Sequence, residues 1–197
     1  MVRRIDWTYN QSMPRPSLRA TRRAELTQAF ARVLARHGYA GATIAAVAAE
    51  AGVAPGLVHH HFASKDDLLA SLVGDLIHGF RARTRALDAA GGDPLDAYAT
   101  AALALGATSD TVAARCWVGV FAEALRDPTL LAQIRRLLDT ELEAIHRRAR
   151  GRFTAHDSGA VLAFIIGSLV FGAFAPRKTS GFAAPALRRL IAALRAS

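Results

Sequence analysis

Three consecutive histidines, His59, His60 and His61, are the residues whose type most readily suggests chemistry, because imidazole binds metal ions and transfers protons. They fall in a segment with the pattern of a short helix. Successive side chains on a helix diverge by about 100°, whereas helical metal ligands are typically four residues apart. The three rings therefore cannot converge on one ion, and we expect neither a metal site nor a metal cofactor.

No other combination of residues favours catalysis. The chain has no G-x-S-x-G, no phosphate-binding loop and no pair of carboxylates on one helix face. Cys116 is the only cysteine, so no intrachain disulfide can form, as is typical of a reducing cytoplasm. A redox-sensing role for Cys116 is the alternative, but a lone cysteine on an apolar helix is usually buried and inert. We expect a cytoplasmic protein that is not an enzyme.

The charge of the chain indicates a polyanionic partner. The formal net charge is +9, and residues 3–36 hold eight arginines but only two acidic residues, Asp6 and Glu25. Clustered cations concentrate positive potential where nucleic acid can bind. The alternative is that the arginines merely reflect the base composition of the genome.

The composition and the apolar periodicity predict an all-α fold. Hydrophobic residues make up 52% of the chain, Ala and Leu dominate, and runs of β-branched residues are scarce. Gly38 is expected to end the first helix, and Asp93-Pro94 and Asp127-Pro128 to begin later ones. The predicted helices cover 18–37, a short stretch after Thr43, 55–62, a long segment after Ser64, stretches opening at Pro94 and Pro128, 160–175 and 185–194. The Thr43 hydroxyl is expected to cap the second of these helices, and residues 64–67 have the pattern of a capping box that opens the fourth.

Residues 43–62 have the spacing of a helix-turn-helix. Ala48 is small where two crossing helices must approach each other, and Gly52 can adopt the positive φ of the turn. Val47, Val58 and Phe62 are placed to share one core. In such a motif the second helix enters the major groove of DNA. An ordinary helical hairpin is the alternative on these offsets alone.

The same region resembles the TetR family of bacterial repressors. The resemblance rests on a basic first helix followed by His37-Gly38-Tyr39, on Thr43-Ile44, on Gly52-Val53, and on Phe62-Ala63-Ser64-Lys65 before Leu68-Leu69. It implies a homodimer that binds a palindromic DNA operator. It also implies a C-terminal domain that binds a small molecule and then releases the DNA.

The resemblance also assigns DNA contacts. Thr43 and Lys65 should contact phosphates, the start of the third helix should face base edges (Ala54, Pro55, Gly56 and Leu57), and the histidines should lie along the backbone and groove wall (His59, His60 and His61). Ala54 departs from the family, which often has a capping Ser or Thr at this position, and residues 54–57 offer no side-chain donor to a base. Direct readout must then use thymine methyl groups, the histidines or DNA shape.

Beyond the head, the chain more weakly resembles the BetI-like group of choline-responsive repressors, through Ala114–Trp117, Phe121–Pro128 and Ile166–Leu169. Ile166 and Val170 stand near positions where that group usually carries an Asp and a Trp. The predicted pocket favours an apolar or weakly polar effector and is lined by Trp117, Phe121, Phe164, Ser168 and Phe171. Glu123 is the only nearby acid, and we interpret it as a solvated or ion-paired residue in preference to a ligand contact. For Trp117 and Phe121, the alternative is that both are plain core.

We therefore expect an all-α protein with three parts: a flexible arm (1–16), a three-helix head with a helix-turn-helix (17–80), and a larger helical domain for effector binding and dimerisation (81–197). Residues 160–175 and 185–194 should form the dimer interface. The first of these segments, at 16 residues, is shorter than the roughly 20 needed to cross a bilayer, so no membrane contact is expected. A non-specific architectural DNA-binding protein is the rival hypothesis.

Overall fold

The computed structural model describes residues 17–103, 111–179 and 182–196, and the regular structure within these ranges is helical. This confirms the all-α prediction, while the expected arm at 1–16 lies outside the described residues. The helices are α1 (Leu18–Gly41), α2 (Ile44–Ala51), α3 (Pro55–His61), α4 (Lys65–Ala89), α5 (Pro94–Leu103), α6 (Thr111–Ala124), α7 (Pro128–Arg148), α8 (Ala155–Phe174), α9 (Pro176–Thr179) and α10 (Ala183–Ala196).

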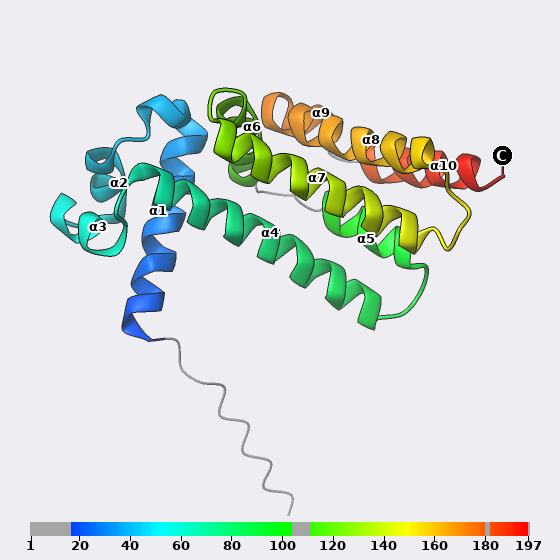
Figure 1. Ribbon diagram of the computed structural model, residues 1–197, viewed down its shortest axis with the longest axis horizontal. Helices are drawn as coiled ribbons and strands as arrows, with labels where there is room; N and C mark the ends of the chain where they lie inside the picture. Colours follow the sequence, from blue (N-terminus) through cyan, green and yellow to red (C-terminus); the bar gives the residue numbers. More distant parts are fainter. Residues whose placement is uncertain (1–16, 104–110, 180–181, 197) are drawn as a thin grey trace, which may run out of the picture.

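Helices α1, α2 and α3 form a small unit at one end of the molecule (Figure 1). Gly38 has φ +68° and interrupts α1 where the sequence predicts its end, although one further turn follows to Gly41. Phe30 and Phe62 are fully buried between these helices and α4. Their burial stabilises the packing of α1, α2 and α3 on α4, because each large ring removes apolar area from water.

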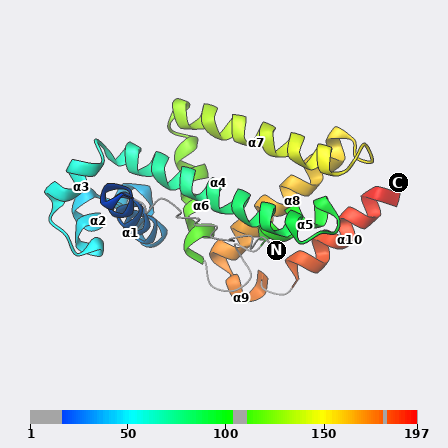
Figure 2. The same ribbon diagram turned by 90° about the horizontal axis from the view of Figure 1, so that it is seen from below.

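The long helix α4 leads from this unit along the length of the molecule, and α7 runs beside it (Figures 1 and 2). Helix α6 crosses between α1 and the rest of the bundle and contacts α1, α7 and α8. One apolar cluster is therefore continuous from Leu26 of α1 through Val120 of α6 to Leu169 of α8. A second cluster holds α5, α7, α8 and α10 together around Leu95, Ile145 and Leu187.

Helix α8 is longer than the sequence pattern predicts. Thr154 and Asp157 form a reciprocal capping box, so the helix begins at Ala155 and has 20 residues. Its length and composition would therefore allow it to cross a membrane, and our argument from a 16-residue span was wrong. In the structure α8 packs one side against α5, α6, α7 and α10.

Candidate functional site

Helix α2 is capped at its start by a side chain and at its end by the backbone bonds that form the turn to α3. The Thr43 hydroxyl accepts from the Ala46 N–H (3.1 Å) and caps the start of the helix. At the other end Gly52 has φ +67°, and the N–H groups of Gly52 and Val53 donate to the carbonyls of Ala49 and Ala48. These two bonds form a Schellman motif, which explains the need for glycine at this position.

Helix α3 presents its first turn to solvent. Ala54, Pro55 and Gly56 are exposed, and Ala54 makes no side-chain cap, as its methyl group dictates. Pro55 has no N–H and the Leu57 N–H donates to the Ala54 carbonyl (2.9 Å), so this turn offers an anion few free N–H groups. His59 and His60 are also exposed, so five of the predicted DNA-facing residues share one open surface.

His61 differs from its two neighbours and corrects our expectation for the three histidines. Its side chain is buried, and its Nδ1 has no hydrogen-bond partner within the described residues. The reason is helical geometry, since His61 follows the buried Val58 by three residues and shares its inward face. Burial, followed by the nearby charges of His60 and Arg19, lowers the pKa of this imidazole.

Lys65 ties the start of α4 to the end of α1. Its Nζ donates to the Tyr39 carbonyl (2.8 Å) and lies 4.0 Å from the centre of the Tyr39 ring. The Tyr39 hydroxyl in turn donates to Asp66, and burial together with this bond raises the pKa of Tyr39. The ammonium group is thus held against the last turn of α1.

Part of the arginine excess is already neutralised within the head. Glu50 accepts hydrogen bonds from both Arg32 (2.6 Å) and Arg36, and these bonds lower the pKa of its carboxyl. Arg23 donates to the His61 carbonyl and stacks on the Phe62 ring at 4.0 Å. The long-range Glu50 pairs could not be recognised from residue counts, which overstate the positive field of α1.

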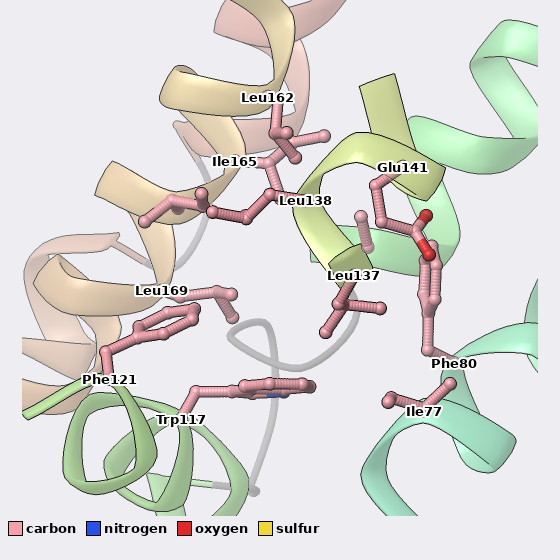
Figure 3. A pocket seen from close by; sticks show the side chains of 12 residues that line it. Ile77, Phe80, Trp117, Phe121, Leu137, Leu138, Glu141, Leu162, Ile165 and Leu169 are labelled. Carbon is pink, nitrogen blue, oxygen red and sulfur yellow. The ribbon is translucent and has the colours of Figure 1, made fainter. Parts of the chain in front are cut away.

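The body contains an apolar cavity of about 80 Å³ between α4, α6, α7 and α8 (Figure 3). Its walls are almost entirely hydrocarbon, and the side chains converge from all four helices and from α5. They are Ile77, Phe80, Ala102, Trp117, Phe121, Leu137, Leu138, Glu141, Leu162, Ile165, Ile166 and Leu169.

Two of the five predicted pocket residues line this cavity. Trp117 and Phe121 stack with ring centres 5.6 Å apart and form its α6 wall. Phe164, Ser168 and Phe171 do not line it. They share a different face of α8 from Leu162, Ile165 and Leu169, because residues at i, i+4 and i+7 follow one stripe of a helix. The sequence pattern therefore predicted correctly that α8 lines the pocket, but it gave the wrong face of the helix.

The acid at the cavity is Glu141 of α7, and the sequence analysis did not single it out. Its carboxylate accepts from the Tyr98 hydroxyl (2.7 Å), and in Figure 3 it stands with Phe80 at the α4 side. Burial, with the nearby charge of Glu141, raises the pKa of Tyr98. Glu123, the only nearby acid that the sequence offered, is not among the lining residues. No local motif marks Glu141, since its partners come from α4 and α5.

A helix-turn-helix with an exposed second helix, joined through packed helices to a body with an apolar cavity, defines a DNA-binding transcriptional regulator. Comparison with known proteins gives the family. Residues 26–72 match the model for bacterial regulatory proteins of the tetR family. The chain is 32% identical to the HTH-type transcriptional regulator BetI of Paraburkholderia phytofirmans over 164 residues, which cover 80% of this chain and 84% of that protein. The chain belongs to the TetR family.

Solved structures agree with this assignment. A transcriptional regulator from Rhodococcus sp. Rha1 superimposes with a TM-score of 0.77 at 25% identity, covering 87% of this chain and 95% of that one. A transcriptional regulator from Saccharomonospora viridis, solved in complex with choline, gives a TM-score of 0.73 at 20% identity over 87% and 96% of the two chains. At that identity the second likeness is one of fold.

Proposed function

We propose that this protein is a homodimeric repressor that binds a palindromic operator and is released by a small, largely apolar effector. The observation that carries the proposal is the placement of α6, which lines the cavity with Trp117 and packs on α1 of the head. An occupant of the cavity can therefore act on the helix that supports the helix-turn-helix. The functional division is a head at 17–80 and a body at 81–197, working in the cytoplasm where operator DNA is found.

The proposed DNA surface combines phosphate contacts with a base-reading turn. Thr43 and Lys65 lie at two helix starts in the head, where phosphates would meet both a cation and free peptide N–H groups. The exposed residues of α3 would enter the major groove, with Ala54 and Leu57 offering methyl groups to thymine and with His59 and His60 beside them.

The proposed dimer surface is the open face of α8 and its surroundings. Phe171 and Phe174 are 59% and 76% exposed, and Phe182, just before α10, is 46% exposed. Exposed aromatic rings of this kind are a solubility liability that a second copy would remove. A twofold axis at α8 would bring the same patch of each subunit together.

The cavity favours an effector whose buried part carries no charge. A charged group enclosed by hydrocarbon loses its hydration without gaining partners, and the cavity wall is nearly all apolar. Choline is the alternative suggested by the relatives, and Trp117, Phe121 and Phe80 would offer it aromatic faces. An effector releases DNA only by binding one arrangement of the heads more tightly than the other.

Footprinting on the DNA flanking the gene tests the proposal. A regulator protects one short palindrome, whereas an architectural protein protects DNA diffusely. The Trp117→Ala variant should then keep operator affinity and lose the response to inducer. The melting temperature of the same variant is the control, since loss of stability together with loss of DNA binding would mean that Trp117 serves only as core.

A further inference from the structure

A polar groove adjoins the apolar cavity. It encloses about 280 Å³ between α4 and α7 and shares Phe80 and Glu141 with the cavity. A second hollow of about 290 Å³ shares Ala144, Arg147 and Arg148 with the groove and extends to Arg150. Hydrocarbon space and polar space are therefore adjacent, with the same two side chains at their boundary.

The groove is rich in arginine. Arg81 and Arg85 lie one turn apart on α4, both are exposed, and no ion pair of the described residues involves either of them. Two adjacent guanidinium groups with no carboxylate partner are well suited to a carboxylate or phosphate.

The remaining charges of the groove are largely paired with each other. Arg148 bonds Asp88 through both terminal nitrogens (2.9 Å each), and Arg147 lies 3.4 Å from Glu143. The Glu141 carboxylate, at the boundary with the cavity, accepts from the Tyr98 hydroxyl. Five arginines line the two hollows, at positions 81, 85, 147, 148 and 150, against the three carboxylates Asp88, Glu141 and Glu143 in and beside them. The excess charge is positive, and its unpaired part consists of Arg81 and Arg85 on α4 together with Arg150 just after α7.

We propose that the effector is an amphipathic anion, whose apolar part fills the cavity and whose carboxylate or phosphate binds Arg81 and Arg85 in the groove. The proposal rests on the proposed function, since it specifies the chemistry of that effector. It also gives the effector a direct hold on α4, the helix that leads to the head.

Calorimetric titration of the full-length protein tests the anion subsite with four probes that share one apolar chain: octanoate, octyl phosphate, octanol and octyltrimethylammonium. At least one anion should bind about 10-fold or more tightly than octanol, the range expected for hydrogen bonds to charged groups. The comparison of octanoate with octyl phosphate separates a carboxylate from a phosphate headgroup.

The Arg81→Gln/Arg85→Gln double variant should reduce the affinity of the preferred anion to that of octanol and leave octanol binding unchanged. The matched control is Arg126→Gln/Arg135→Gln, which removes two exposed arginines that line neither hollow. Octanol binding as tight as the anions, a preference for the quaternary ammonium probe, absence of anion binding, or an unaffected double variant would each overturn the proposal. Anion binding that never releases operator DNA would instead count against the proposed function.

Discussion

The Cys116 thiol of α6 donates a hydrogen bond to the Ala31 carbonyl of α1, with Sγ and O 3.3 Å apart. The next residue, Trp117, lines the cavity, and two residues later Gly119 lies against Leu34 of α1. Within one turn, α6 therefore contacts both the space offered to an effector and the helix that carries the DNA-binding unit.

The α1–α6 contact should tolerate little added bulk at Gly119. A Cβ there would lie 3.6 Å from Leu34, an ordinary contact, so Gly119→Ala should be neutral or gain up to about 1 kcal/mol in helix propensity. Gly119→Leu must displace Leu34 and should cost about 1–3 kcal/mol by overpacking. Urea unfolding measures both. Gly74→Leu is the control, because nothing lies within 4 Å of a Cβ at that exposed position of α4. Equal costs for the two leucines would refute this account of α6.

Lys65→Ala should weaken binding to operator and random DNA alike and lower the salt slope by about one, because Lys65 is proposed to contact a phosphate. It also removes the bond to the Tyr39 carbonyl, which should lower stability by about 1 kcal/mol. Salt titrations of DNA affinity and urea unfolding on one preparation separate the two effects. Lys178→Ala, in the exposed α9, is the control for loss of one lysine. An unchanged salt slope would show that Lys65 stabilises the head through its bond to Tyr39 and does not contact a phosphate.

Stability should fall as the pH drops below about 6.5, the ordinary pKa of histidine. The folded state depresses the pKa of His61, so in that window the unfolded chain binds more protons and acid favours unfolding. At higher pH the imidazole is neutral in both states and the effect vanishes. Melting temperature against pH measures it, with His61→Leu expected to flatten the profile. His59→Gln, which alters an exposed ring, should keep the wild-type slope.

Phe171→Glu combined with Phe174→Glu should convert the proposed dimer into monomers, because the interface would bury two carboxylates without partners. Sedimentation at micromolar protein measures the change. Leu125→Glu, at a site that is 80% exposed between α6 and α7, should remain dimeric. A wild-type protein that sediments as a stable monomer would contradict the interface altogether.

The elements that could be predicted from the sequence are those with local signals. The Thr43 cap, the positive φ of Gly52 and the Asp127-Pro128 helix start each depend on a few neighbouring residues, and all three predictions are confirmed. Ser64 also caps α4 as expected, since its hydroxyl accepts from the Asp67 N–H. The Asp67 carboxylate, however, accepts from the Ala63 N–H and not from the Ser64 N–H that a capping box would use. These caps and turns could be predicted from the sequence because each involves residues only a few positions apart.

The cavity depended on signals that are not local. Helix α8 is apolar on almost every side, so its sequence contains no polar stripe to show which face meets α7, and Phe164 and Phe171 were placed on the wrong one. The contribution of α4 and α7 was missed for a different reason. Glu141 and Phe80 lie 61 positions apart and meet only after the bundle has assembled.

Because α4 is long, a small tilt at the proposed effector site would become a larger displacement at the head. Its 25 residues span about 37 Å at 1.5 Å per residue. Phe80, which touches the cavity, lies toward the far end of this rod, and Lys65 at the near end braces the head. Phe80 lies 15 residues from Lys65, about 22 Å along the helix, so a tilt of about 8° at Phe80 would carry the head end roughly 3 Å. That displacement is close to the 3.4 Å step between successive bases on one DNA strand, so a small rotation beside the cavity could move the recognition helix out of register with its operator.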